Sequence, residues 1–260
     1  MIKLIATDVD GTLVKDSSPR VYPEIFEEIR RLKEKGIICA IASGRQYHSV
    51  AAMFAPVAEN LIFIVENGAH IRCRDTDISV MAMKNQDAEE IIRDIRCKGL
   101  DMVVSTPRGS LLESKNQEFI DLIINGYRNK AEIVSDVLSE KREIIKVAAY
   151  RKNSIREVGE SFFIPKWAKR CKTCMAGEEW VDFMDSQVDK GNALKTVQDF
   201  FHISKAETMV FGDNGNDIGM LQVAEESYAV DTARENVKQF AKHICGGYEK
   251  KGVLEILKSI

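Results

Sequence analysis

The first eighty residues alternate between short apolar runs and amphipathic segments. The apolar runs span residues 2–7, 37–42 and 61–65, and they lack the apolar–polar alternation of a half-exposed strand. Residues 22–35 and 46–54 separate these runs and carry apolar side chains at helical spacing. Strands that are apolar on both sides and separated by helices are typical of a parallel sheet with helices on both faces. This part of the chain therefore predicts an α/β fold.

The last seventy residues repeat the same alternation. The expected elements are a helix at 192–201, a strand at 208–211, a helix at 218–223, a strand at 227–230, a helix at 235–241 and a terminal helix at 253–260. Because both ends of the chain follow one pattern, we expect them to share one sheet.

The middle of the chain follows a different pattern. Its expected elements are helices near 88–96 and 118–127 and strands near 102–105, 144–150 and 180–184. These strands alternate more and are expected to be half exposed. The sequence therefore predicts a Rossmann-like parallel-sheet core made of residues 1–82 and 187–260, with an α+β domain inserted at residues 83–186.

The composition is ordinary for a globular protein. Hydrophobic residues make up 45% and charged residues 30% of the 260 residues, and the net charge is -3. This charge argues against broad nucleic-acid binding, which usually needs a basic face. No apolar stretch approaches the roughly 18–20 residues of a membrane span. The N-terminus shows no signal-peptide pattern, so we expect a cytoplasmic location.

Two carboxylates directly follow the first expected strand, in Asp8-Val9-Asp10-Gly11-Thr12. In an open α/β sheet, ligands bind beyond the carboxyl ends of the strands. Residues two positions apart in extended backbone point to the same side, so the two acids would repel each other unless a cation or a shared proton compensates. An Asp-Gly turn with solvated acids is the alternative interpretation.

A second acidic cluster, Gly212 to Asp217, follows the expected strand at 208–211. Asp213 and Asp217 could join Asp8 and Asp10 around one hard cation, because Mg²⁺ prefers oxygen ligands. The alternative is a capped turn, since Asp and Asn favour such positions.

Two further groups could hold an anion. Ser43-Gly44-Arg45 lies between a strand and a helix, where a hydroxyl and unpaired N–H groups can bind phosphate. A plain helix N-cap is the alternative.

Lys190 begins an expected helix, where its positive charge opposes the helix dipole, so a nearby anion would compensate that charge. A solvated surface lysine is the alternative.

These four elements, in this order, resemble the haloacid dehalogenase-like hydrolase superfamily. The match is to its phosphatases, because the dehalogenases do not use a second aspartate at the position of Asp10. The long insertion is similar to the large α/β cap of the Cof-like sugar-phosphatase branch. Glu66-Asn67-Gly68-Ala69 is also similar to that branch.

The resemblance implies the central chemistry. Asp8 would be the nucleophile that forms an aspartyl-phosphate, and Asp10 would be the general acid and base. Mg²⁺ would be the cofactor, held by Asp8, the backbone carbonyl of Asp10, Asp213 and Asp217.

The resemblance also implies the groups that bind the substrate. Ser43, the Gly44 N–H and Lys190 would hold the phosphoryl oxygens, and Asn216 would position Lys190 or the phosphate. Residues on the core side that could face the substrate are Arg45, Asn67 and Gly68.

The resulting expectation is a Mg²⁺-dependent phosphatase of small phosphorylated metabolites, above all sugar phosphates. One alternative is a phosphotransferase of the phosphomannomutase type, in which the phosphoryl group passes to a sugar hydroxyl. A basic cap pocket would favour it, and residues 166–170 could supply one. A non-catalytic phosphate sensor is a third possibility, but it would not need both Asp8 and Asp10. The oligomeric state is left open.

Overall fold

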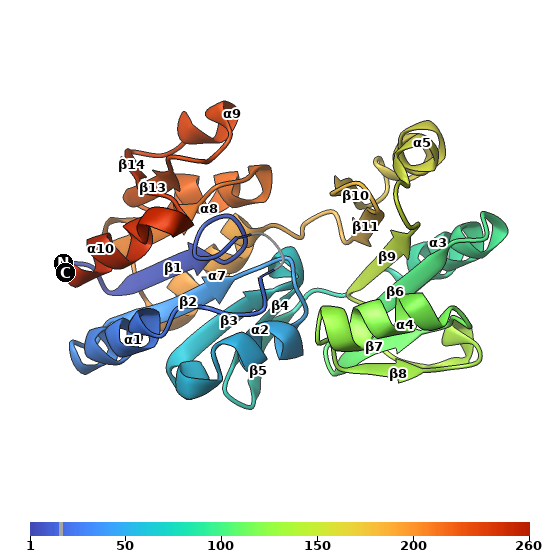
Figure 1. Ribbon diagram of the computed structural model, residues 1–260, viewed down its shortest axis with the longest axis horizontal. Coiled ribbons are helices and arrows are strands. Elements are labelled where there is room, and N and C mark those ends of the chain that lie inside the picture. The colour runs from blue at the N-terminus through green and yellow to red at the C-terminus, as the bar shows by residue number, and fades with distance from the viewer. Residues whose placement is uncertain (16–17) are drawn as a thin grey trace. The chain divides into compact units, whose positions relative to one another are not determined.

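The computed structural model describes residues 1–15 and 18–260, and they form two compact units. Met1–Ser79 and Asp189–Ile260 make up one unit, which we call the core domain; Val80–Val188 make up the other, the cap domain. Figure 1 shows that both chain ends contribute strands to the core domain. Within the part of the chain described, no helix is long and apolar enough to cross a membrane.

The core domain contains an eight-stranded sheet in the order β14-β13-β12-β1-β2-β3-β4-β5. Its strands are β1 (Leu4–Asp8), β2 (Ile38–Ala42), β3 (Leu61–Val65), β4 (His70–Cys73), β5 (Thr76–Val80), β12 (Thr208–Gly212), β13 (Glu226–Val230) and β14 (His243–Cys245). The six strands from β14 to β3 pair in parallel, and β4 joins β3 antiparallel. β1 lies in the middle, with Leu4 beside both Ile38 and Thr208. The predicted sharing of one sheet by both chain ends is confirmed.

Helices cover both faces of the core sheet. They are α1 (Glu24–Glu34), α2 (Tyr47–Met53), α7 (Lys190–Phe201), α8 (Ile218–Val223), α9 (Glu235–Lys238) and α10 (Gly252–Lys258). Apolar residues of α1, α2 and α10 pack with Ile5, Ile41 and Phe63 on one face. Apolar residues of α7 and α8 pack with Ala6 and Val210 on the other. The central strands are almost entirely buried and largely apolar, as expected of strands covered on both sides, and the α/β prediction is confirmed.

The cap domain contains a six-stranded sheet in the order β10-β11-β9-β6-β7-β8. Its strands are β6 (Asp101–Thr106), β7 (Gly109–Leu112), β8 (Ala131–Ile133), β9 (Lys146–Tyr150), β10 (Lys172–Ala176) and β11 (Trp180–Met184). Its helices are α3 (Asn85–Cys97), α4 (Gln117–Asp121), α5 (Arg156–Val158) and α6 (Ile164–Trp167), and α4 continues into a π-helical turn, Leu122–Gly126. The pairing is antiparallel except between β7 and β8.

The expectation of half-exposed cap strands is wrong for β6, β9 and β11. β9 is buried along its whole length, β6 is buried from Met102 onward, and β11 is buried from Val181 onward. One face of the sheet packs against α3 and Trp167, and the opposite face packs against Phe119 of α4. A strand covered on both sides needs apolar side chains at successive positions, which weakens the alternation that a half-exposed strand would show.

Residues 166–170, the candidate for a basic pocket, are exposed apart from Trp167, and two of their three basic side chains pair with acids. Lys166 pairs with Asp94 of α3, and Arg170 pairs with Asp87 and Glu90 of the same helix. Trp167 is fully buried between them, and its Nε1–H donates to Asp94 at 2.9 Å. The acidic face of α3 therefore offsets the charges of Lys166 and Arg170, which makes these two side chains less suited to a basic pocket of the phosphotransferase kind.

Replacing Trp167 by alanine is expected to destabilise the cap domain by about 3–5 kcal/mol, because it leaves a large cavity and removes one of the donors to Asp94. Trp167→Phe keeps most of the packing and loses only the hydrogen bond, which is worth about 0.5–1.5 kcal/mol. Urea unfolding followed by circular dichroism measures both changes. Equal losses for the two variants would contradict the importance of the packing.

Candidate active site

The predicted site residues gather at the carboxyl ends of four neighbouring core strands. Asp8 ends β1, Ser43 follows β2, Glu66 follows β3 and Asp213 follows β12. These strands are adjacent in the sheet, so their carboxyl ends share one edge. This is the edge at which open α/β sheets bind ligands.

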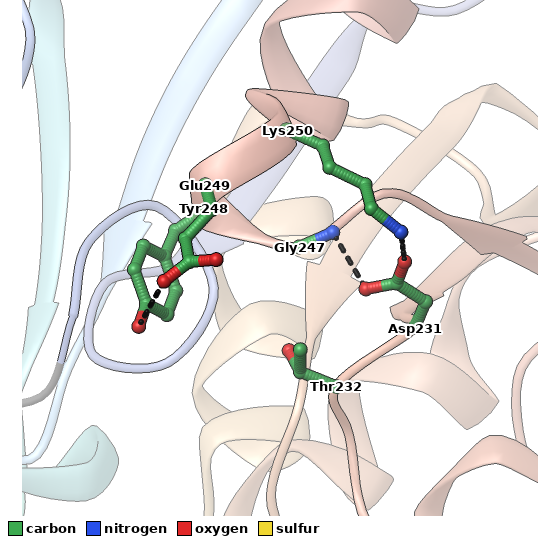
Figure 2. Close-up of a pocket in the computed structure, with 6 residues that line it drawn as sticks. All are labelled: Asp231, Thr232, Gly247, Tyr248, Glu249 and Lys250. Carbon is green, nitrogen blue, oxygen red and sulfur yellow. Dashed lines mark hydrogen bonds and ion pairs between the residues drawn. The ribbon is translucent and has the colours of Figure 1, made fainter.

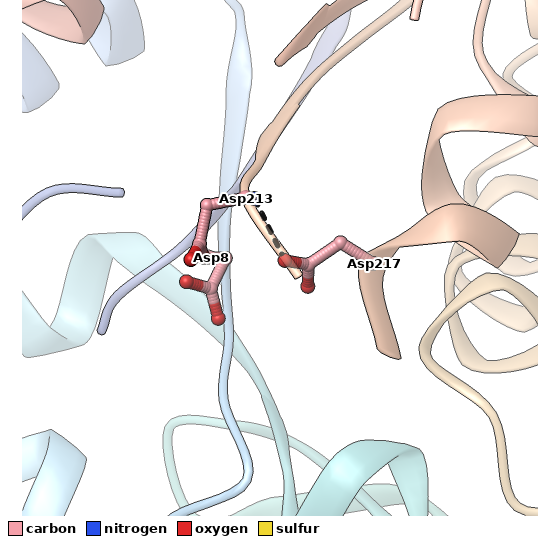
Figure 3. A group of neighbouring side chains, drawn as sticks. All are labelled: Asp8, Asp213 and Asp217. Carbon is pink, nitrogen blue, oxygen red and sulfur yellow. Dashed lines mark hydrogen bonds between the residues drawn. The ribbon is translucent and has the colours of Figure 1, made fainter. Parts of the chain in front are cut away.

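Three carboxylates form a cluster at this edge. Ligand oxygens of Asp8, Asp213 and Asp217 all lie within 4.8 Å of one another. Figure 3 shows the carboxylates of Asp8 and Asp213 side by side, with Asp217 beside them on the adjoining helical turn. The N–H groups of Asp213 and Asn214 both donate to Asp217 Oδ2 at 3.0 Å, which fixes that carboxylate. Segments from the two ends of the chain thus meet in one acidic site.

Lys190 compensates part of this negative charge. Its Nζ donates to Asp8 Oδ1 at 2.6 Å and to Asp217 Oδ1 at 2.7 Å, and its side chain is fully buried. Burial alone would lower the pKa of Lys190, but Asp217 and Asp8 hold this pKa above its usual value, so the ammonium stays charged. The alternative of a solvated surface lysine is wrong.

Asp8 lies in an environment that disfavours its charge. Burial, and then the neighbouring Asp217, raise its pKa well above the usual value, and Lys190 offsets only part of this shift. Among the described residues, its Oδ2 atom has no hydrogen-bond partner although it is buried. Three carboxylates with one ammonium leave an excess of negative charge. The donor set therefore fits a divalent cation with a preference for oxygen ligands.

Asp10 does not belong to this acidic cluster. Its carboxylate binds Arg45 through two oxygens, one of them accepting from Nε at 2.8 Å. Arg45 also donates to the carbonyl oxygen of Ser18 at 3.0 Å. Arg45, which was predicted to face the substrate, pairs with Asp10 in the structure. A bidentate carboxylate–guanidinium pair holds both side chains in a fixed orientation.

Ser43 lies in the turn between β2 and α2 and is buried. Its Oγ accepts the N–H of Arg45 at 3.1 Å. Gln46 occupies the N-cap position of α2, so the alternative of Ser43 as a plain N-cap is wrong. Gly44 leaves room for Asn67, because a Cβ at Gly44 would lie 3.1 Å from Asn67 Oδ1.

Asn67 and Asn216 hold two of the loops together. Asn216 Nδ2 donates to Asn67 Oδ1 at 2.9 Å, and this is a different contact from the expected one with Lys190 or phosphate. Asn67 has a left-handed backbone with φ 58°. Gly68, with φ 103°, is required here because a Cβ would lie 2.6 Å from the carbonyl oxygen of Asp189. The turn after β3 thus packs against the start of α7.

Two contributing residues were missed by the sequence analysis. Asp189 is the N-cap of α7, and its Oδ1 accepts the Gly191 N–H at 2.8 Å; an acid just before a helical segment is a signal that could have identified it. Thr12 is fully buried and donates to Asp213 Oδ1 at 3.1 Å. Nothing in its sequence context points to that contact.

Outside the acidic cluster, a hollow lies beyond the carboxyl ends of β13 and β14 (Figure 2). It measures about 440 Å³ and contains none of the predicted site residues. Asp231 accepts the Gly247 N–H at 2.8 Å and pairs with Lys250 at 2.5 Å. Asp231 is thus paired with a base, whereas the acidic cluster sets three carboxylates against one ammonium.

The amino-acid sequence matches the model of one protein family over most of its length. The family model described as haloacid dehalogenase-like hydrolase matches residues 5–257. The chain belongs to the haloacid dehalogenase-like hydrolases. The match runs through the core domain at both ends of the chain and through the cap domain, so the membership covers the whole architecture.

Individual relatives of this hydrolase are phosphatases. The 5-amino-6-(5-phospho-D-ribitylamino)uracil phosphatase YbjI of Escherichia coli (strain K12) is 24% identical, over 100% of this chain and 96% of that protein. A phosphoglycolate phosphatase of Archaeoglobus fulgidus is 28% identical, over 98% and 96%. A crystal structure from Eubacterium rectale is 38% identical with a TM-score of 0.91, over 99% and 98%. This chain is a phosphatase of the haloacid dehalogenase-like family.

Proposed function

We propose that this phosphatase hydrolyses phosphate monoesters of small metabolites, sugar phosphates among them, in a Mg²⁺-dependent reaction that passes through an aspartyl-phosphate on Asp8. One observation carries the proposal. Asp8 ends the central strand, contacts a fully buried ammonium and lies within 4.8 Å of two further carboxylates. A buried carboxylate with an unpartnered oxygen, in a site that needs a cation, is suited to attack an anionic phosphorus centre.

In the first step, a carboxylate oxygen of Asp8 forms a bond to phosphorus while the bond from phosphorus to the leaving oxygen breaks. Asp10 donates a proton to that leaving oxygen. In the second step, water attacks the phosphorus, Asp10 accepts the water proton, and the bond to Asp8 breaks. Inorganic phosphate and the unchanged enzyme result. Lys190 stays charged throughout and offsets the negative charge at the phosphoryl group.

A divalent cation would be held by Asp8, Asp213 and Asp217, and the resemblance adds the backbone carbonyl of Asp10. When bound, it would neutralise charge on the phosphoryl oxygens. Ser43 and Gly44 lie at the same sheet edge and would contribute a hydroxyl and an N–H to these oxygens. The contact of Asn216 with Asn67 supports a role in holding the two loops rather than in binding phosphate.

Hydrolysis is favoured over phosphoryl transfer by the cap. A transferase must hold a second anionic group and exclude water, and Lys166 and Arg170 of the basic segment 166–170 are already paired with acids of α3. The named relatives act on a phosphorylated ribitylaminouracil and on phosphoglycolate, whose organic parts are unlike. Their names therefore support small phosphate monoesters as the substrate class without selecting one member.

The test is a screen of phosphorylated metabolites with Mg²⁺, with and without acceptor sugars. The proposal predicts release of inorganic phosphate at a rate that acceptors leave unchanged. Appearance of a new sugar phosphate in place of inorganic phosphate would establish the transferase alternative. Absence of both products across sugar phosphates, other small monoesters and an activated aryl phosphate would contradict the proposal.

Removing divalent cations with a chelator is expected to lower the rate about a thousandfold, because a cation contributes several kcal/mol of transition-state stabilisation. Adding Mg²⁺ back should restore the rate. Phosphate release measured before and after dialysis checks this. Full activity in the chelated enzyme would disprove the cation requirement.

Asp10→Asn is expected to lower the rate by about 10²–10⁴ for alkyl phosphates, which need a proton on the leaving oxygen, and much less for aryl phosphates. The ratio of the two losses is the measured quantity. Equal losses for both substrate types would exclude general-acid catalysis by Asp10.

A further inference from the structure

The chain contains three Asn-Gly pairs, at Asn67, Asn125 and Asn214. In such a pair, the backbone nitrogen of glycine can attack the side-chain carbonyl carbon of the preceding asparagine, because no Cβ blocks the approach. Whether this happens depends on the local backbone and on exposure. The structure gives the three pairs different environments.

Asn214 and Gly215 have an open arrangement. Both residues are exposed. The Gly215 nitrogen lies 2.8 Å from Asn214 Oδ1 and donates its hydrogen to that atom, so the two reacting groups are in contact. Asn214 has an extended backbone with ψ 172°, and among the described residues, its chain neighbours aside, none has an atom within 4 Å of the position that a Gly215 Cβ would take. The Asn214 side chain also accepts the Asp217 N–H in a capping box, so that contact must open before the ring closes, but no packed side chain has to move.

Asn67 and Gly68 are constrained. Asn216 holds Asn67 Oδ1 at 2.9 Å, and the backbone of Asn67 is left-handed with ψ 22°. Gly68 is buried against the carbonyl oxygen of Asp189. A ring closing at Asn67 would have to break these contacts.

Asn125 and Gly126 are exposed, but they belong to the π-helical turn Leu122–Gly126. The Tyr127 N–H donates to the Leu122 carbonyl at 2.8 Å across this turn. A helical backbone turns the following nitrogen away from the asparagine side chain. Asn125 therefore serves as an exposed internal control.

We propose that Asn214 is a site of spontaneous deamidation in the loop that carries Asp213 and Asp217. The Gly215 nitrogen loses its proton and bonds to the Asn214 side-chain carbonyl carbon, and ammonia leaves. The product is a five-membered succinimide. Water then adds to one of its two carbonyl carbons, and the ring opens to aspartate or to isoaspartate. Water is the only co-reactant.

The two products affect the loop differently. Aspartate keeps the main chain intact and can still cap the short turn Gly215–Asp217, although it adds a charge beside Asp213. In isoaspartate, the peptide bond to Gly215 is made by the former side-chain carbonyl. The main chain at position 214 is therefore longer by one methylene group. The N–H groups of Asp213 and Asn214, which both bind Asp217 Oδ2, then no longer keep their spacing to that carboxylate. The loss of activity that follows rests on the proposed function.

The experiment ages the full-length protein with Mg²⁺ at physiological temperature and mildly alkaline pH. Peptide mapping by mass spectrometry follows the mass change of amide-to-acid conversion at each Asn-Gly pair, and fragmentation separates isoaspartate from aspartate. We expect conversion at Asn214 to exceed conversion at Asn125 and at Asn67 within the same sample. Phosphatase activity should fall in proportion to the isoaspartate content at position 214.

Two variants make the test decisive. Gly215→Ala fits the open space and should slow conversion at Asn214 while leaving Asn125 unchanged. Asn214→Asp reproduces the aspartate product, so it separates the effect of charge from that of the rerouted main chain. Conversion at Asn214 no faster than at Asn125, or unaffected by Gly215→Ala, overturns the proposal. Selective conversion without loss of activity supports the modification site and contradicts the placement of this loop in the active site.

Discussion

Replacing Asp8 by asparagine is expected to reduce the turnover number by about 10⁵-fold while the protein stays folded. An amide oxygen is a poor nucleophile toward phosphorus, so the aspartyl-phosphate cannot form. The fold should tolerate the change, because the asparagine Oδ1 can still accept the hydrogen bond of Lys190. Asp8→Asn also removes one negative charge from the cluster, so the electrostatic repulsion between position 8 and Asp217 is lost.

Three measurements test this expectation together. Steady-state kinetics gives the loss in turnover, and urea unfolding shows whether the fold persists. Acid quenching with a radiolabelled substrate should trap labelled protein for the wild type and none for Asp8→Asn. Asp199→Asn, an exposed acid on α7, is the matched control and should change nothing. Substantial turnover by Asp8→Asn would refute the assignment of the nucleophile.

Replacing Lys190 by methionine is expected to lower both stability and activity. The ammonium is fully buried between Asp8 and Asp217, and methionine keeps the length of the side chain while removing its charge. Breaking a buried ion pair from one side typically costs about 3–5 kcal/mol, because the remaining charges lose their partner. Activity should fall by about 10²–10³-fold or more, since a preorganised charge at the phosphoryl group is lost.

Divalent cations provide the distinguishing measurement for Lys190→Met. With the ammonium removed, a bound Mg²⁺ would be the main compensation for the three carboxylates, so the variant should gain more stability from Mg²⁺ than the wild type does. Urea unfolding with and without Mg²⁺ measures this difference. Lys195→Met, on the exposed side of the same helix, should stay within about 0.5 kcal/mol of the wild type. Equal gains from Mg²⁺ in the wild type and in Lys190→Met would argue against a shared electrostatic role.

The fold of the core domain could be predicted because the hydrophobic pattern of each segment matches the way in which that segment is buried in the folded domain. β3 was predicted at its observed bounds, and so was α8. Short edge strands such as β8 and β14 were missed, because three residues are too few to establish a period. In the cap domain, helices pack on both faces of the sheet. Side chains on both sides of β9 are therefore buried, and the strand does not alternate between apolar and polar residues as a half-exposed strand would.

The residue types of the site could be predicted, but their pairing could not. The acids after β1 and β12 were expected to meet because parallel strands end at one edge. Arg45 and Asp10 form a bidentate pair, and Asn216 binds Asn67; both contacts depend on side-chain orientation across loops far apart in sequence. Lys190 was ambiguous for the same reason, because only tertiary structure shows that a helix-terminal lysine is buried between two acids.

The position of β1 between β2 and β12 has a consequence for biosynthesis. Thr12 and its partner Asp213 are 201 positions apart. At about 5–20 residues per second, the ribosome needs roughly 10–40 s to make the intervening chain. During that time the nascent N-terminal strand has no β12 beside it, and its aspartates have neither Lys190 nor the second acidic loop. The proposed active site can therefore assemble only late in translation, after β12 has been synthesised and has paired with β1.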